Sequence, residues 1–473
     1  MKVNQTYLYI FCVGSLFYIG AVIFYRLVLS PLAQFPGPRL AAATRLYEIY
    51  FQIVKGGTFT WHINDLHDKY GPVVRITPWE LHIRDPQFYN TLYAGPGKYR
   101  NKDPLFSFIG YPKSIFSLNS YDHHRLWRKI LGQFFKKNAV LEFEPVIREN
   151  TQKLCKHFSA AVNASTVLEL NCAFHCFTSD TLSQHAFGKT LAFNYLDRPQ
   201  LSESWKKKVN TMFEFCRVVR HFNFVADIAH LIPNVVSLLV RGYDDVYSME
   251  QATRSRIQQL IEDFDEQEAD AQRASNVITK PFFEMPKAIY PAILANPDVP
   301  LLEKSQSRLE DDAIFLMFAG TDAPSQTIAI TMFHILNNPR SATIREGLRI
   351  ASVVTTRLPR SAPDEILQYQ QWKIPAGTFV SMSTFFILRD PNIFPEPENF
   401  TPERWLLEPD ELQQLESMNW SWSHYLIGCL VRRFDMALYE TTELNVKMVR
   451  DNFIGQTGAG LNNVQVRVLK EHP

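Results

Sequence analysis

An uncharged apolar run near the N-terminus limits the architectures open to this chain. Tyr7 to Tyr25 contains nineteen consecutive residues without a charge. As a helix the run would extend about 28 Å, enough to span the hydrocarbon core of a bilayer. A cleaved signal peptide is the alternative, but the run exceeds the usual apolar stretch of roughly 7 to 15 residues and no clear small-x-small cleavage site follows it. The run predicts a transmembrane anchor over residues 7–29.

The basic residues that flank the run predict its orientation. Lys2 is the only one before it, whereas Arg26, Arg39 and Arg45 follow it. By the positive-inside rule, residues 1–6 face the lumen and the bulk of the chain lies in the cytoplasm. Only lumenal N-x-Ser/Thr sequons can be glycosylated, so Asn4 is the one candidate. The other sequons, expected to stay unmodified, are at Asn163, Asn399 and Asn419.

A proline-rich segment follows the predicted anchor. Residues 30–39 contain Pro31, Pro36 and Pro38, which lack amide donors and fix φ, so the anchor helix cannot continue through them. We expect a stiff hinge here and one domain over residues 40–473, which with 46% hydrophobic residues can bury a large core.

The balance of charges argues against nucleic-acid binding, and the cysteine spacing argues against a zinc-ribbon site. The chain has 49 Lys and Arg against 48 Asp and Glu, a net charge of +1, so no nucleic acid is expected as a partner. Six cysteines are scattered without the paired spacing of a zinc ribbon, and most are expected to be buried and reduced.

Apolar periodicity predicts a mainly α fold with small β-sheets, an α+β class. Short β-rich runs occur at residues 73–76 and 81–83, and helical spacing dominates from about Asp122 to Leu260. The longest helical pattern, Asp311 to Asn337, is interrupted at residues 319–325 by a glycine and a proline, which cost about 1 and 3 kcal/mol in a helix interior. Either the helix opens there against a ligand, or this is an ordinary helix end or bend.

Several short motifs are weak alone but occur in an informative order. Cys429 lies just ahead of a helical pattern and could bind iron. The order along the chain is the anchor, the proline-rich segment, Ala319-Gly320-Thr321-Asp322, Glu346 with Arg349, Pro402-Glu403-Arg404-Trp405, and Cys429. This order resembles the cytochrome P-450 family of haem-thiolate monooxygenases, from the anchor to Leu469. Residues 70–76 and 372–378 are most similar to filamentous-fungal microsomal members, including the trichodiene-oxygenase type.

The resemblance implies the cytochrome P-450 fold, bound haem, an endoplasmic reticulum location and roles for single residues. Cys429 corresponds to the axial ligand of the haem iron, whose thiolate pushes electron density onto the metal. Glu346, Arg349 and Arg404 correspond to a buried structural ion network beneath the haem. Asp322 corresponds to the acid of the oxygen-activating helix, through which protons reach bound dioxygen.

The resemblance also implies partners for the haem propionates. His124 and Arg128 correspond to a helix that reaches one propionate, and Arg360 stands where a second partner is expected. For each of the three the alternative is an ordinary surface charge.

The chain departs from the family pattern at its expected proton-delivery site. Ala323 stands where a hydroxyl residue should follow Asp322, and alanine cannot relay a proton. Thr321 and Ser325 lie two positions away on either side, so each points about 200° away from Ala323 on a helix. Neither can simply replace the missing hydroxyl.

Two further departures concern the expected haem site. About thirty residues, the length of a helical hairpin, appear absent between residues 338 and 346, through a deletion or an unrecognised exon. Around Cys429 the family's Phe, Gly, Arg and Gly are replaced, so haem affinity is expected to be low. The replacing residues are Trp422, Tyr425, Ile427 and Val431.

The leading hypothesis is a membrane-bound monooxygenase. It would hydroxylate or epoxidise an apolar secondary-metabolite intermediate, a terpenoid first or a polyketide second, with dioxygen and electrons from an NADPH-cytochrome reductase. The rival is a haem-poor, non-enzymatic relative that acts as a membrane-bound binding or scaffold protein. An unrelated helical membrane protein is a third interpretation, which would leave the motif order to coincidence.

Overall fold

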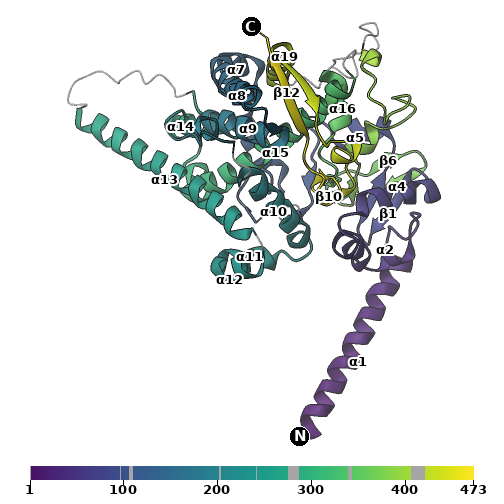
Figure 1. The fold of residues 1–473 in the computed structure, drawn as a ribbon. Coiled ribbons are helices and arrows are strands. Elements are labelled where there is room, and N and C mark those ends of the chain that lie inside the picture. Colours follow the sequence, from purple (N-terminus) through teal and green to yellow (C-terminus); the bar gives the residue numbers. More distant parts are fainter. Residues whose placement is uncertain are drawn as a thin grey trace. The chain divides into compact units, whose positions relative to one another are not determined.

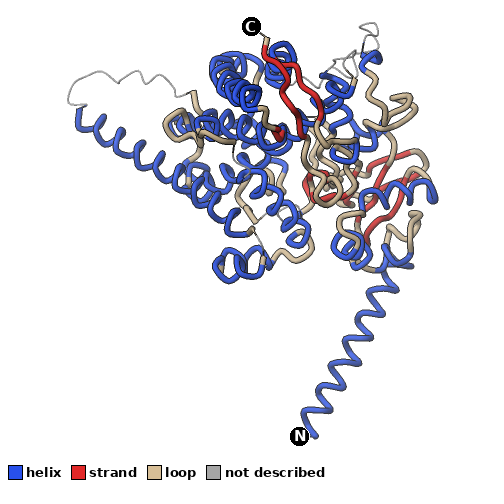
Figure 2. Tube along the Cα trace, in the orientation of Figure 1, coloured by secondary structure: helices blue, strands red, loops and turns tan. Residues whose placement is uncertain are grey.

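The structure is a computed structural model that describes residues 2–95, 97–105, 110–201, 204–240, 242–274, 287–338, 344–405 and 421–472. Helices predominate and the sheets are small, which confirms the mainly α class with small β-sheets (Figure 2). The chain divides into two compact units, one formed by residues 1–103 with 355–387 and the other by residues 104–354 with 388–473. The single domain expected over residues 40–473 stays a prediction.

The first unit begins with a helix long and apolar enough to cross a membrane, at Thr6–Leu29. It consists of α1 (Lys2–Phe24) and a π-helical end, η1 (Tyr25–Leu29) (Figure 1). The other helices of this unit are α2 (Arg39–Ala43), α3 (Leu46–Ile49), η2 (Tyr50–Val54), α4 (Phe59–Tyr70), η3 (Pro86–Phe88), α5 (Tyr89–Leu92) and α17 (Thr384–Ile387).

A five-stranded sheet of order β1-β2-β8-β5-β3 forms the core of the first unit. Its first two strands coincide with the predicted β-rich runs and pair antiparallel, because a two-residue turn at Pro78 and Trp79 joins them. The strands are β1 (Val73–Thr77), β2 (Glu80–Ile83), β3 (Asn101–Lys102), β5 (Arg360–Ser361) and β8 (Phe379–Ser381), with a separate hairpin of β6 (Leu367–Tyr369) and β7 (Trp372–Ile374).

The proline-rich segment is tied to this sheet through Arg75. The Arg75 amide on β1 donates to the Pro36 carbonyl at 2.7 Å. The buried Arg75 guanidinium donates to the Arg26 carbonyl in η1 at 2.8 Å and to the Pro78 carbonyl at 2.6 Å. One side chain therefore joins the end of the apolar helix to the sheet.

The second unit is a helical body with two small sheets. Strand β12 (Gln465–Glu471) pairs with β4 (Val167–Glu169) and β9 (Phe434–Leu438), and β10 (Arg450–Asn452) forms a hairpin with β11 (Ile454–Gln456). The helices are α6 (Tyr121–Gly132), α7 (Lys137–Glu142), α8 (Glu144–Ala164), α9 (Leu170–Phe187), α10 (Ser204–Val219), α11 (Phe224–Leu231), α12 (Pro233–Leu239), α13 (Tyr243–Ala274), α14 (Ile289–Ala295), α15 (Gln306–Asn337), α16 (Ile344–Ala351) and α19 (Ser421–Arg433).

Helix α15 is the central element of this unit and packs most closely against α9 and α16 (Figure 1). A Cβ atom at Gly320 would lie 2.6 Å from the Leu182 side chain on α9, and one at Gly347 on α16 would lie 2.3 Å from the Thr331 hydroxyl. Glycine at these two positions lets the three helices approach each other.

The predicted interruption at residues 319–325 neither opens α15 nor ends it. The helix runs as one α-helix through Pro324. Pro324 has no amide to bond the Gly320 carbonyl, but packing supports the turn, since the Thr178 hydroxyl on α9 donates to the Thr321 carbonyl at 3.0 Å. Tertiary contacts therefore outweigh the local cost of glycine and proline.

Candidate active site

One face of α15 is incompletely covered, although most of the helix is buried. Phe315, Ala319, Ala323 and Thr327 are each half-buried, and their i, i+4 spacing puts them on one face. Two of the four are alanines, so little side-chain volume stands beside the backbone there. This half-exposed face of α15 is a candidate surface for a bound apolar molecule.

Aromatic rings extend this face at its N-terminal end. The Phe315 ring stacks on Phe116 with centroids 4.7 Å apart, and Phe453 meets Phe116 edge-on at 5.2 Å. Phe213 on α10 lies parallel to Phe453 at 6.3 Å. Phe116, Phe213, Phe315 and Phe453 together form what we call the aromatic cluster.

Phe453 reaches the cluster from a strained turn. It sits between β10 and β11 with φ of +82°, a conformation that bulky residues rarely adopt. Its amide donates to the Asp451 carboxylate at 3.0 Å, which helps to hold the turn. Such strain costs on the order of 1 to 3 kcal/mol and is commonest where function needs a side chain at a fixed place.

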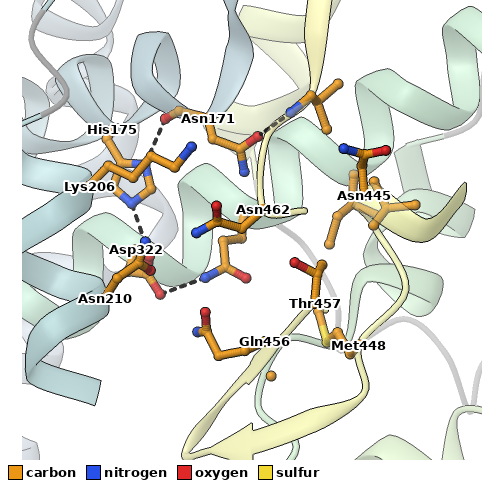
Figure 3. Close-up of a pocket in the computed structure, with 15 residues that line it drawn as sticks. Asn171, His175, Lys206, Asn210, Asp322, Asn445, Met448, Gln456, Thr457 and Asn462 are labelled. Atoms are coloured by element: carbon orange, nitrogen blue, oxygen red, sulfur yellow. Dashed lines mark hydrogen bonds and ion pairs between the residues drawn. The ribbon is translucent and has the colours of Figure 1, made fainter. Parts of the chain in front are cut away.

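Asp322 lies on a neighbouring face of α15, about 100° from Ala323. Its buried carboxylate accepts hydrogen bonds from His175 Nε2 on α9 and from Gln326 Nε2, each at 2.9 Å (Figure 3). The sequence reasoning missed His175, because the two partners are 147 residues apart and nothing local marks a histidine within a helix for such a contact.

His175 is held at both nitrogens of its ring. Its Nδ1 lies 2.6 Å from the Asn171 carbonyl and its Nε2 lies 2.9 Å from the Asp322 carboxylate. The Ser325 hydroxyl lies 3.1 Å from each ring nitrogen. His175 and Asp322 therefore form a buried hydrogen-bonded pair.

A polar pocket lies beside this hydrogen-bonded pair (Figure 3). Asp322, Gln326 and Ile330 line it from successive turns of α15, and Lys206 and Asn210 line it from α10. The C-terminal part of the chain contributes Asn445, Val446, Met448, Gly455, Gln456, Thr457, Asn462 and Val464. Because its lining is largely amide and charged groups, this pocket suits water or a small polar molecule and not an apolar substrate.

Thr321 and Ala323 have the orientations expected from their helical positions. Thr321 is buried and its hydroxyl donates back to the Met317 carbonyl at 2.7 Å, whereas Ala323 belongs to the half-exposed face. The face that adjoins open space thus has a methyl group where the family has a hydroxyl.

Glu346 is the centre of a buried ion network. Arg349 Nε donates to Glu346 Oε2 at 2.9 Å and its Nη2 to Oε1 at 2.7 Å, while Arg404 Nε donates to Oε1 at 3.1 Å. The Thr401 amide and the Trp405 indole add bonds of 3.1 and 2.8 Å. Burial alone would raise the pKa of Glu346, but these donors hold it below its ordinary value.

The structure thus brings together all three residues predicted for this network. Thr401 and Trp405 were not predicted as partners, although both flank Arg404 in the same motif. Arg349 also donates to the Leu388 and Pro397 carbonyls at 2.8 Å each, so nearly every donor in the network has an acceptor.

The three residues predicted to bind propionates fall in different units. His124 and Arg128 lie one turn apart on α6, half-buried and exposed respectively. Arg360 lies on β5 in the first unit, where burial lowers its pKa and its guanidinium stands 5.7 Å from the centre of the Tyr93 ring. Each is described in its own unit, and their common role stays a prediction.

Cys429 does not precede a helix as the sequence suggested. It is an interior residue of α19, which starts at Ser421 and ends at Arg433. The prediction was wrong on this point because the helix continues through Gly428, whose cost of about 1 kcal/mol is too small to end it among leucines that favour a helix. Of the replaced residues, Tyr425 is half-buried, Ile427 is buried and Val431 is exposed, while the side chain of Trp422 lies outside the described residues.

Comparison with known proteins identifies the family. The family model described as Cytochrome P450 matches residues 38–342 and 340–421. The chain is 33% identical to "Conidiogenone synthase PchP450" of Penicillium rubens, over 95% of this chain and 97% of that protein. It is 30% identical to "Cytochrome P450 monooxygenase TRI4" of Fusarium sporotrichioides, over 97% of this chain and 95% of that protein.

A solved structure shows the same fold. Retinoic acid-bound cyanobacterial CYP120A1 is similar over 86% of this chain and 94% of its own, with a TM-score of 0.56 and 15% sequence identity. The likeness to it concerns the fold alone.

The comparisons also locate where the chain differs from its relatives. The two segments matched by the family model meet at residues 340–342, and the match ends at residue 421, before Cys429. The alignment with the Penicillium protein extends over 496 residues, more than the 473 of this chain, so that protein has internal residues with no counterpart here.

Proposed function

The chain belongs to the cytochrome P450 family of haem-thiolate monooxygenases, and from this we propose that it takes an apolar intermediate of secondary metabolism as its substrate. Its curated relatives are fungal monooxygenases of secondary metabolism. Members of the family act on hydrophobic substrates and receive electrons from a redox partner. Oxidation of an apolar intermediate fits this chain.

The half-exposed face of α15 with the aromatic cluster is the observation that carries this proposal. Alanines beside the backbone and stacked rings at one end offer an apolar surface of the kind that binds small molecules without charge. We expect a terpenoid first and a polyketide second, since one relative is named a conidiogenone synthase and another is the TRI4 monooxygenase. Hydroxylation or epoxidation is the expected oxidation.

The residues present fit a haem only in part. The half-exposed face of α15 and the Glu346 network are consistent with a bound haem. Cys429 is not, since it lies inside a helix. We therefore derive no step of oxidation through the iron.

We assign the proton-handling role to Asp322. Both Asp322 and its partner His175 line the polar pocket, so water in the pocket would exchange protons with this hydrogen-bonded pair. Thr321 and Ala323 complete this part of the site, and Ala323 supplies no hydroxyl. His124, Arg128 and Arg360 remain the proposed propionate partners.

The cellular setting is part of the proposal. We propose a lumenal tail at residues 1–6, a single anchor at 7–29 and a hinge at 30–39, with the catalytic part at the cytoplasmic face of the endoplasmic reticulum. The apolar helix at Thr6–Leu29 supports this arrangement. An NADPH-cytochrome reductase would be the electron donor, and Asn4 the glycosylated residue. We also propose that residues have been lost between 338 and 346, where positions 339–343 lie outside the described residues. The sequon at Asn419 lies outside the described residues as well.

A second candidate function is favoured by the position of Cys429. A relative that lacks a thiolate ligand would keep the apolar surface but not turn over its ligand. It would then act as a membrane-bound binding or scaffold protein.

Ligand binding tests the proposal independently of turnover. The full chain in lipid nanodiscs would be titrated with farnesol, an apolar C15 isoprenoid, by calorimetry. Ala323→Phe should weaken binding at least tenfold because the ring fills the half-exposed face, while Ala437→Phe on the exposed surface of β9 should not. Farnesol binding that is absent, or equal in both variants, would overturn the assignment. Oxidised farnesol formed with NADPH and reductase would separate the first candidate from the second.

A further inference from the structure

We infer that Cys429 packs α19 against α8 and is not an axial iron ligand, and that no other cysteine of this chain takes that role. The chain as it stands then forms no thiolate-ligated haem. The inference assumes that the chain belongs to the cytochrome P450 family, and it does not depend on the proposed substrate.

The position of Cys429 within α19 disfavours a thiolate. It is the ninth residue of a 13-residue helix, close to the C-terminal end. The backbone amides there are engaged within the helix, and the negative end of the helix dipole opposes a nearby negative charge. Reactive and metal-binding thiolates are instead stabilised at helix N-termini or beside cations.

The side chains that interact with Cys429 lie on α19 itself and on α8, although α19 also contacts α15. The Tyr425 hydroxyl one turn earlier is hydrogen-bonded to the Cys429 thiol, and burial together with this bond raises the pKa of Tyr425. The Arg148 guanidinium on α8 stands 5.6 Å from the centre of the Tyr425 ring. Cys155, also on α8, is close enough for a charge on Cys429 to affect it.

The cations near Cys429 are already paired with carboxylates. Arg148 on α8 is engaged with Glu144 through a 2.7 Å hydrogen bond, and Arg433 at the end of α19 with Glu471 at 2.6 Å.

None of the other five cysteines replaces Cys429, and all six lie in the described part of the chain. Cys12 lies in the apolar helix α1. Cys172 and Cys176 on α9 are buried and hydrogen-bonded to each other, which raises the pKa of Cys172. On α10, burial raises the pKa of Cys216 to about 12.

The chain after Cys429 leaves no room for a ligand loop before a helix. Helix α19 ends at Arg433 and β9 begins at Phe434, and β9 is fixed by pairing with β12. The family model stops matching at residue 421. Cys429 is thus a residue within helix α19 that lies close in sequence to the position of the family's iron ligand.

Spectroscopy of the full chain tests the inference. The protein would be produced with haem supplied, and its haem content and reduced, carbon-monoxide-bound spectrum recorded for the wild type, Cys429→Ala, Cys429→Ser and the matched control Cys155→Ala. We expect no thiolate-type band in any of the four, and equal haem content. A thiolate-type band in the wild type that is lost in both Cys429 variants but kept in Cys155→Ala would overturn the inference.

The same preparations separate this inference from the proposed function. Farnesol binding by a protein without the thiolate-type band supports this inference and the proposed substrate class, and it favours the second candidate function over oxidation. A protein that shows neither still supports the ligand inference, while the proposed substrate class fails.

Discussion

The Glu346 network and the Cys429 segment were expected from one family resemblance, yet only the first has the expected geometry. The network joins α16 to residues 397–405, and each partner is held by contacts of its own, such as those of Arg349 with two backbone carbonyls. A ligand loop depends on a few consecutive residues. A change of those residues can remove the loop and leave a distributed network intact.

Restoring a family-type cysteine segment should have the largest effect on this comparison. If residues 406–433 are replaced by the aligned segment of the Penicillium relative, the thiolate-type band should rise from absent to near-stoichiometric with haem. The reason is that the Glu346 network and the half-exposed face of α15 are already formed. A folded chimera that takes up no haem would show that more than the cysteine segment is lost.

Removing the charge at the centre of the network should destabilise the protein by about 3 to 5 kcal/mol. Glu346→Gln leaves the Arg349 guanidinium buried without its carboxylate, and breaking a buried pair carries such a cost. Thermal or urea unfolding would measure it, with Glu266→Gln on the exposed surface of α13 as the control. Equal stabilities would mean that the network contributes nothing to the fold.

Loss of the hydrogen bond between His175 and Asp322 should lower the free energy of unfolding, as loss of the Glu346 charge does, whereas loss of the Cys429 side chain should change it little. His175→Gln removes the hydrogen bond to the buried Asp322 carboxyl, at a cost of about 1 to 3 kcal/mol. The half-buried His157, which bonds a single carbonyl at 3.0 Å, is the matched control and should lose less than about 1 kcal/mol as His157→Gln. A reversal of this order would contradict a structural role for the His175–Asp322 pair.

The dependence of stability on acid pH should report on His334, a buried histidine close to Glu346. Burial lowers the pKa of His334 to about 4, and its ring stacks on Phe400 at 4.9 Å. The unfolded chain takes up this proton near pH 6.5, so stability falls as the pH drops from about 6.5 to about 4. His334→Phe should remove about 2 kcal/mol of the loss between pH 7 and 5, whereas His472→Gln at the surface should not. Unfolding midpoints at the two pH values would measure the difference, and parallel losses in wild type and His334→Phe would refute it.

The smallest effect is expected at Cys429. Cys429→Ala should change the unfolding free energy by less than about 1 kcal/mol, because the side chain is only half-buried. Chemical unfolding next to Glu346→Gln gives the contrast directly. A loss as large as that of Glu346→Gln would show that the segment is as tightly built as the network.

The sequence predicted these regions with unequal success for physical reasons. Glu346 and Arg349 are one helical turn apart, so their pairing can be read locally, whereas the Trp405 indole joins them only through folding. The cost of Gly320 and Pro324 suggested an interruption, but packing against α9 outweighs it. At Cys429 the family pattern suggested a loop where the local residues favour a helix. His175 could not be found, since a partner 147 residues away leaves no local trace.

The tie between Arg75 and the end of the apolar helix bears on how the protein can be produced in water. Its guanidinium is buried, and one of its two carbonyl acceptors belongs to Arg26. A version trimmed after residue 29 would remove that acceptor and leave the cation short of a partner in the sheet. A soluble form should therefore begin at or before residue 26, with the apolar residues ahead of it replaced by a polar leader.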